Sequence, residues 1–140
     1  MPMASLVDGD VVGASPELDG LLGAFLGEVP DATGVLVTGE SGNPIASKLA
    51  AERIQLIAAS AMATLAAWAG EVVAANLRLS GMWGVTIEGP TWKVIVAPTP
   101  SHAAVVLVTL EKPADAPRVQ RALPGLLSAV DRSLGGRTTQ

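Results

Sequence analysis

Residues 54–77, with the sequence IQLIAASAMATLAAWAGEVVAANL, decide the fold more than any other part of the chain. The larger apolar residues recur at helical spacing, and the opposite face carries mostly alanine instead of charge. A helix that is apolar nearly all the way round has to be covered on two sides, because water solvates neither face well. The chain has few other helical stretches and can cover only one side from within. The sequence therefore predicts a second protein chain on the other side, which is typical of an interaction module and not of an enzyme.

Composition predicts one folded domain. The chain has 140 residues, of which 49% are hydrophobic and 16% charged, so it can bury a sizeable core and is not disordered. We expect the domain to span residues 15–134, with a flexible arm at 1–14 and a flexible tail at 135–140.

Charge and cysteine content exclude several classes of partner and site. The formal net charge of -4 offers no field that would attract a polyanion, so we expect no nucleic-acid partner. With no cysteine there is no disulfide and no thiolate metal site. The first residues lack the pattern of a signal peptide, and we expect a cytoplasmic protein.

The alanine-rich helix also raises the possibility of a membrane span. Residues 54–70 carry no charge and approach the lower length limit of a span. Alanine is only weakly lipophilic, however, and Arg53 and Glu71 bound the run tightly. The interpretation that we favour is a helix of the folded domain and no membrane span.

Periodicity predicts the order helix, two strands, helix, three strands, helix. The predicted elements are residues 16–29, 34–38, 44–47, 50–77, 83–87, 92–96, 103–110 and 118–134. Hairpin connections imply an antiparallel five-stranded sheet, and the apolar run at 103–110 implies that both faces of that strand are covered. The predicted fold class is therefore α+β, with the sheet between helical layers and the order α-β-β-α-β-β-β-α.

The sequence leaves two details of the helices open and predicts a third. The long helix breaks or bends at Gly70, or it continues. Pro124 either kinks the last helix or marks its true beginning near Ala122. Gly135 and Gly136 are expected to end it.

No set of residues predicts catalysis. Residues 34–41 have the glycines of a phosphate-binding loop, but Glu40 stands where the lysine is needed and the segment lies in a predicted hairpin. One histidine, His102, forms neither a metal site nor a triad. Nothing holds Glu40 and Glu52 at a working distance from each other. We predict no enzyme, no cofactor and no metal.

The element order and three local patterns together resemble the Roadblock / dynein light chain family, whose fold is profilin-like. Residues 35–46, VLVTGESGNPIA, are similar to the family's strand, polar turn and short strand that begins with proline. The second pattern is the alanine-rich helix with Met62 and Leu65 leading to a hairpin, and the third is the strand end VIVAP at 94–98 before the apolar run at 103–110.

The resemblance implies a homodimer without catalytic residues that binds or regulates nucleotide hydrolases. In the family the third strand pairs with its copy and the long helix packs on its copy. The residues expected at the dimer interface are Ile54, Ile57, Ala58, Ala61, Leu65 and Trp68 on the helix and Trp83, Val85 and Ile87 on one face of the strand. For Trp68, core and interface stay equally open.

The leading functional hypothesis is a dimeric regulator or scaffold of a Ras-like small GTPase in a bacterial signalling or polarity system. An architectural adaptor without influence on nucleotide turnover is the alternative. A small-molecule sensor is less favoured, because the sequence reveals no convergent polar set.

Overall fold

The computed structural model describes residues 16–111 and 116–138, and it has the predicted fold class and element order. The elements are α2 (Pro16–Glu28), β1 (Ala32–Gly39), β2 (Pro44–Lys48), α3 (Arg53–Asn76), β3 (Val85–Glu88), β4 (Trp92–Pro98), β5 (Ala104–Glu111) and α4 (Ala116–Thr138). The predicted arm at 1–14 lies outside the described residues.

The five strands form one antiparallel sheet in the order β2-β1-β5-β4-β3. The strand β2, which begins with Pro44, lies at one edge of the sheet, and β3 forms the other edge. The apolar strand β5 lies at the centre between β1 and β4, so its backbone groups are paired on both sides.

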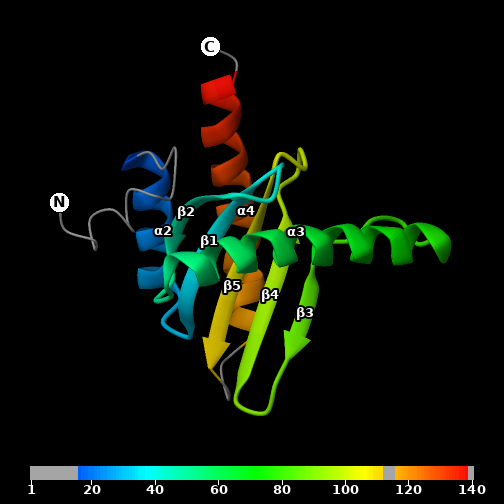
Figure 1. Cartoon of the computed structure of the whole chain (residues 1–140), viewed down its shortest axis with the longest axis horizontal. Helices are drawn as coiled ribbons and strands as arrows, with labels where there is room; N and C mark the ends of the chain where they lie inside the picture. The colour runs from blue at the N-terminus through cyan, green and yellow to red at the C-terminus, as the bar shows by residue number, and fades with distance from the viewer. Residues whose placement is uncertain (1–15, 112–115, 139–140) are drawn as a thin grey trace.

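Helices cover both faces of the sheet, with α3 on one face and α2 and α4 on the other (Figure 1). Successive residues of β5 alternate between the two cores: Val106 and Val108 pack with α2 and α4, whereas Val105 and Leu107 pack with α3. Two separate hydrophobic cores therefore meet across one sheet, as the apolar run of β5 predicts.

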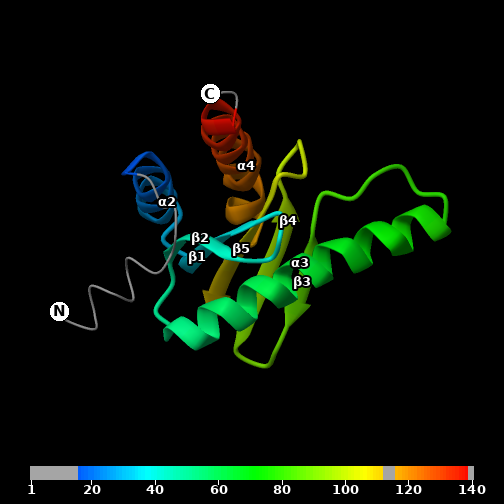
Figure 2. The ribbon, with the colours of Figure 1, turned by 45° about the horizontal axis from the view of Figure 1, so that its top comes forward.

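The helix α3 runs unbroken from Arg53 to Asn76. It begins where the backbone N–H of Glu52 donates to Oε1 of Gln55 at 2.8 Å. Past its end, Arg78 adopts a left-handed backbone (φ 57°) and the Leu79 N–H donates to the Ala74 carbonyl at 2.8 Å. Figure 2 shows that the C-terminal half of α3 extends beyond the β3 edge of the sheet.

Gly70 neither breaks nor bends α3 out of its helical geometry; it makes room for the chain that returns to β3. A Cβ at this position would approach Met82 Sδ and would lie 2.8 Å from Val85 Cγ2, which is closer than carbon atoms pack. The glycine therefore allows the segment before β3 to lie directly on the helix.

The structure decides between the two alternatives for Pro124 in α4 and corrects the predicted end of this helix. It contains Pro124 within one continuous helix, so the alternative that the helix begins near Ala122 is wrong. It also continues to Thr138, so the predicted end at Gly135 and Gly136 is wrong and part of the expected tail is helical. A glycine lowers helix stability by only about 1 kcal/mol relative to alanine, which does not force an end.

The prediction that Trp83 shares a strand face with Val85 and Ile87 is wrong. The strand β3 begins at Val85, whose side chain approaches α3 at Gly70. Trp83 precedes the strand and lines a cleft beside α4, on the opposite face of the sheet. Gly84 separates the two, and a Cβ there would lie 3.0 Å from the Val96 carbonyl oxygen, so the chain passes too close to β4 for an ordinary side chain.

Two glycine substitutions test this packing with opposite expected signs. We expect Gly23→Ala to stabilise the domain by about 0.5–1 kcal/mol, since Gly23 is an exposed position of α2 with nothing within 4 Å of a new Cβ. We expect Gly34→Ala to destabilise it by about 1–3 kcal/mol, since the new Cβ would lie 2.5 Å from Leu49 Cδ1 and 3.0 Å from Thr109 Oγ1. Urea unfolding monitored by circular dichroism gives both values, and two changes of the same sign would contradict the packing described.

Candidate protein interaction surface

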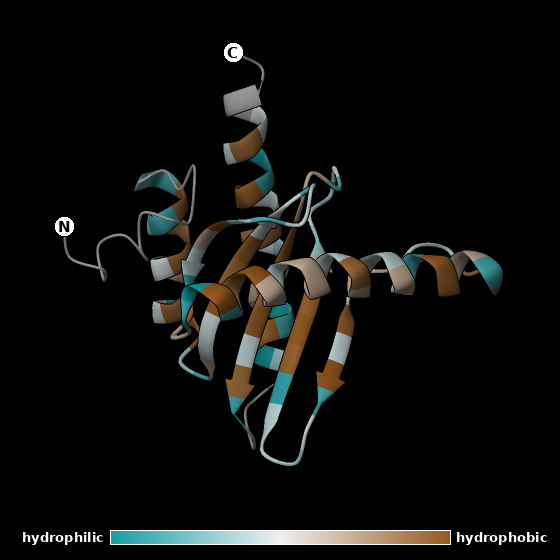
Figure 3. Ribbon diagram, viewed as in Figure 1, coloured by the Kyte–Doolittle hydropathy of each residue, from teal (hydrophilic) through white to brown (hydrophobic). Residues whose placement is uncertain are grey.

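The outward face of α3 carries a row of apolar side chains in which successive positions are four, three, four, three and four residues apart. The row consists of Ile54, Ala58, Ala61, Leu65, Trp68 and Val72, and we call it the α3 seam. Ile54, Leu65 and Trp68 are 74%, 53% and 64% exposed. Alternating steps of three and four place side chains in one line along a helix, which is the spacing that packs against a second helix. Figure 3 shows that most of the length of α3 is apolar.

The face of α3 that contacts the sheet is built differently. Leu56 is the one large buried residue there, and Ser60, Ala63, Ala67 and Ala74 supply the rest. These small residues bring the helix axis close to the sheet, since interaxial and face-to-face distances follow side-chain size. The larger residues of α3 are thereby left on the outside.

The edge strand β3 continues the apolar surface next to α3. Its outer side is open in the described chain, because β4 is its neighbour on one side only. Ile87 is 44% exposed and Val85 is half-buried. An edge strand with apolar side chains and free backbone groups is suited to pairing with another strand.

Most of the predicted interface residues lie together in the structure, and Trp83 lies apart from them. Ile57 lies beside the α3 seam with 46% of its side chain exposed. Ala61 belongs to the seam but is half-buried beside the β1–β2 turn, where its Cα is 3.8 Å from the position of a Cβ on Gly42. Trp68 is exposed, so within this chain it is not a core residue. Trp83 is the residue that moves away, to the other face of the sheet.

Sequence reasoning missed several exposed apolar residues of the same region. They are Met62 (58% exposed), Val72 (37%), Val73 (56%), Leu77 (64%) and Leu79 (59%). Continuing the seam spacing by four residues from Trp68 would have found Val72. The others could not be assigned from spacing, because their exposure depends on how far α3 extends past the sheet.

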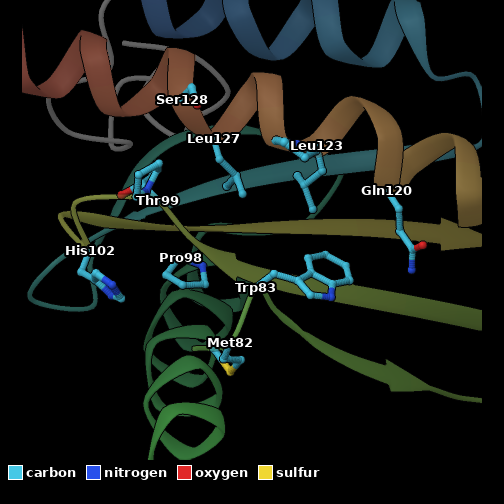
Figure 4. Close-up of a pocket in the computed structure, with 11 residues that line it drawn as sticks. Met82, Trp83, Pro98, Thr99, His102, Gln120, Leu123, Leu127 and Ser128 are labelled. Atoms are coloured by element: carbon cyan, nitrogen blue, oxygen red, sulfur yellow. The ribbon is translucent and has the colours of Figure 1, made fainter. Parts of the chain in front are cut away.

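A cleft of about 560 Å³ lies on the other side of the molecule, between α4 and the end of β4 (Figure 4). Its apolar lining consists of Met82, Trp83, Pro98, Pro100, Leu123, Pro124 and Leu127, and its polar lining of Thr99, His102, Gln120 and Ser128. No sequence pattern indicates that these polar residues act together, because they come from segments about 20–30 residues apart that only the fold brings to one place.

The turn between β4 and β5, which forms one wall of the cleft, is held from both sides of the sheet. From α4, the Asp131 carboxylate accepts hydrogen bonds from the backbone N–H of Ser101 at 3.0 Å and from its hydroxyl. From α3, Glu71 Oε1 lies 3.0 Å from Nδ1 of His102, a residue with a left-handed backbone (φ 65°). His102 therefore has a carboxylate neighbour.

The acidic residues of the described part of the chain do not assemble into a metal site. Among residues 16–111 and 116–138, no three His, Cys, Asp or Glu side chains lie close enough together to hold a metal ion. Glu40 is exposed in the β1–β2 turn, and Glu52 caps the start of α3.

By length and composition alone, α3 meets the criteria for a membrane span, and it is the one helix in the described chain that does. Such a single helix is weak evidence, because core helices of folded domains meet the same criteria. Here Leu56, Ala63 and Ala67 pack on the sheet, so α3 is an integral layer of the domain.

Comparison with solved structures identifies the fold family. No protein-family model and no curated protein matches the sequence. In structure, the chain is similar to a Roadblock/LC7 domain from Streptomyces avermitilis, with a TM-score of 0.76, 18% identity and coverage of 84% of this chain and 98% of that one. The chain has the Roadblock/LC7 fold.

Two further similar structures are of MglB. Myxococcus xanthus MglB has a TM-score of 0.75 and 12% identity, and 86% of this chain and 89% of that chain are covered. The gliding protein MglB from Thermus thermophilus has a TM-score of 0.71 and 18% identity, with coverage of 83% and 87%. The fold that the sequence resemblance implied is thereby confirmed.

The hydrogen bonds between Ser101 and Asp131, which hold the β4–β5 turn on α4, can be tested by substitution. We expect Asp131→Ala to lower the free energy of unfolding by about 1–2 kcal/mol, because two hydrogen bonds to a charged acceptor are lost near the surface. The adjacent, exposed Arg132→Ala is the control and should change stability by less than about 0.5 kcal/mol. Urea unfolding measures the change in free energy for each variant. Equal changes for Asp131→Ala and Arg132→Ala would mean that the hydrogen bonds of Asp131 do not stabilise the domain.

Proposed function

We propose that this chain forms a homodimer that acts as a non-catalytic regulator or scaffold of a Ras-like small GTPase in a bacterium. The observation that carries the proposal is the α3 seam together with the open edge of β3. Both surfaces are apolar, they adjoin each other, and they occur in a fold shared with MglB and Roadblock/LC7 structures. The resemblance to the Roadblock / dynein light chain family supplies the class of partner.

The proposed dimer places α3 against its copy and β3 beside its copy. A two-fold axis near Ala58, Ala61 and Leu65 would let each seam cover the other, because a two-fold interface uses the same patch on both chains. The small side chains of Ala58 and Ala61 would permit close approach of the helices. Pairing of β3 with β3 would satisfy the free backbone groups of the edge.

The dimer would leave the α2 and α4 face and the polar turns free for other contacts. We propose that the GTPase binds the dimer and not the separate chains, and that the complex acts in the cytoplasm. The chain would then act by positioning groups of the GTPase itself.

A substitution in the seam tests dimerisation. We expect Leu65→Glu to give a monomer in multi-angle light scattering, because a carboxylate without a partner in the helix pair costs about 3–5 kcal/mol, which raises the dimer dissociation constant more than about a hundredfold. Leu65 is a better site for the new charge than Ala61. It is 53% exposed, whereas a larger side chain at Ala61 would disturb the adjacent β1–β2 turn.

The matched control is Gly23→Glu. It adds the same charge on an exposed site of α2 that has open space around it, and it should leave the dimer intact. Circular dichroism confirms that both variants fold. A wild-type protein that is monomeric at micromolar concentration, or a Leu65→Glu protein that remains dimeric, would contradict the proposed interface.

The GTPase hypothesis is tested with purified Ras-like GTPases encoded in the same genome. We expect the wild-type protein and Gly23→Glu to change the rate of GTP hydrolysis or nucleotide exchange of one of them at least about tenfold, which is well below the largest effects of GTPase regulators. The monomeric Leu65→Glu should have no such effect.

The same measurements distinguish a GTPase regulator from the alternative function, an architectural adaptor. Binding of a GTPase without a change in either rate would favour an architectural adaptor. If none of these GTPases binds, the assignment of partner is wrong, whatever the oligomeric state.

A further inference from the structure

The cleft beside α4 has the size and shape of a small-molecule site. Its volume of about 560 Å³ lies within the range of about 300–1,000 Å³ that is usual for ligand pockets. It is bounded by three structural elements: α4, the end of β4 with its turn, and the segment before β3 (Figure 4). None of the residues that line it belongs to the α3 seam or to β3 itself, so the cleft is distinct from the proposed dimer interface.

Trp83 gives the cleft an open aromatic surface. The side chain is 53% exposed, although it shares the cleft wall with the apolar side chains of Leu123 and Leu127. A half-exposed indole in a concave, apolar site offers a flat face for stacking and an N–H for hydrogen bonding. Trp83 and Val85, on either side of Gly84, lie on opposite faces of the sheet.

Gln120 and Ser128 supply polar side chains on the α4 side of the cleft. The amide of Gln120 and the hydroxyl of Ser128 make no hydrogen bond within the described part of the chain, and they are available to a ligand.

The lining selects against charged ligands. Among the described residues that line the cleft there is no Asp, Glu, Lys or Arg. Thr99 is buried and its hydroxyl is already bonded to the backbone of Ala104, and Nδ1 of His102 faces Glu71. A charged group placed there would lose hydration without gaining a partner of opposite charge.

We propose that this cleft binds an uncharged, planar heteroaromatic molecule that carries a hydrogen-bond donor. The ring stacks on the indole of Trp83, and its N–H donates to the side-chain carbonyl oxygen of Gln120. The proposal does not depend on the proposed GTPase function.

The experiment uses benzimidazole, a neutral bicyclic ring with one N–H donor and one nitrogen acceptor, added to the full-length protein. The three tryptophans give three indole N–H signals in a ¹H–¹⁵N spectrum, and Trp→Phe variants assign them. We expect the Trp83 signal alone to shift, with a dissociation constant in about the millimolar range, as is usual for a ligand of so few atoms. The signals of Trp68 and Trp92 should stay in place.

Variants and a second probe test the contacts. Trp83→Ala and Gln120→Ala should each weaken binding at least about fivefold, as measured by saturation-transfer or ligand-line-width titration. Trp92→Ala is the matched control, because this tryptophan is also half-exposed (43%) but lies at the far end of β4. The probe 1-methylbenzimidazole, which lacks the N–H donor, should bind as weakly to the wild type as benzimidazole binds to Gln120→Ala.

Three outcomes would overturn the proposal. The first is a Trp83 signal that does not move, and the second is equal movement of all three indole signals, which indicates nonspecific contact. The third is a Trp83 shift with a proline-rich peptide and none with benzimidazole, which would assign the cleft to a protein partner. Because Leu65→Glu leaves the cleft residues unchanged, benzimidazole binding by that monomeric variant separates this inference from the dimer proposal.

Discussion

The structure depends on how α3 divides its two apolar faces. Its small residues, such as Ser60, Ala63 and Ala67, contact the sheet, while Leu65 and Trp68 point outward. Side-chain size decides this division, because a helix lies close to a sheet only where its residues are small. The large apolar residues then remain exposed, and their hydrophobic surface is available for association.

The central strand β5 makes this arrangement possible. Because both of its faces are apolar, helices can pack on either side of one sheet, and because it pairs with both β1 and β4, the two hairpins join into one sheet. The edges are thereby assigned to the short strands β2 and β3. The β3 edge lies next to the projecting half of α3 (Figure 3), so the open strand and the open helix adjoin each other.

The opposite face has a different character. There, α2 and α4 bury large residues such as Leu22, Phe25 and Leu123, and the cleft described above lies where α4 passes the end of β4. Two glycines permit the close packing of the segment that returns to the sheet. Gly70 lets this segment lie on α3, and Gly84 lets it pass close to the backbone of β4. A candidate protein-binding surface and a candidate ligand cleft thus lie on opposite sides of one sheet.

The sequence by itself determined the elements, their order and the two-sided covering of β5, because periodicity, turn residues and prolines act locally. It also identified the outward row of α3, since a repeat of three and four residues marks a line on any helix. Only the tertiary structure decided the positions of Trp83, Gln120 and Pro124 relative to one another. It likewise decided the continuation of α4 through Pro124 and Gly135, because packing of Leu123, Leu127 and Val130 in the core outweighs the local preference of single residues. The exposure of Val73 and Leu79 depends on how far α3 extends past the last strand, and no local pattern encodes that distance.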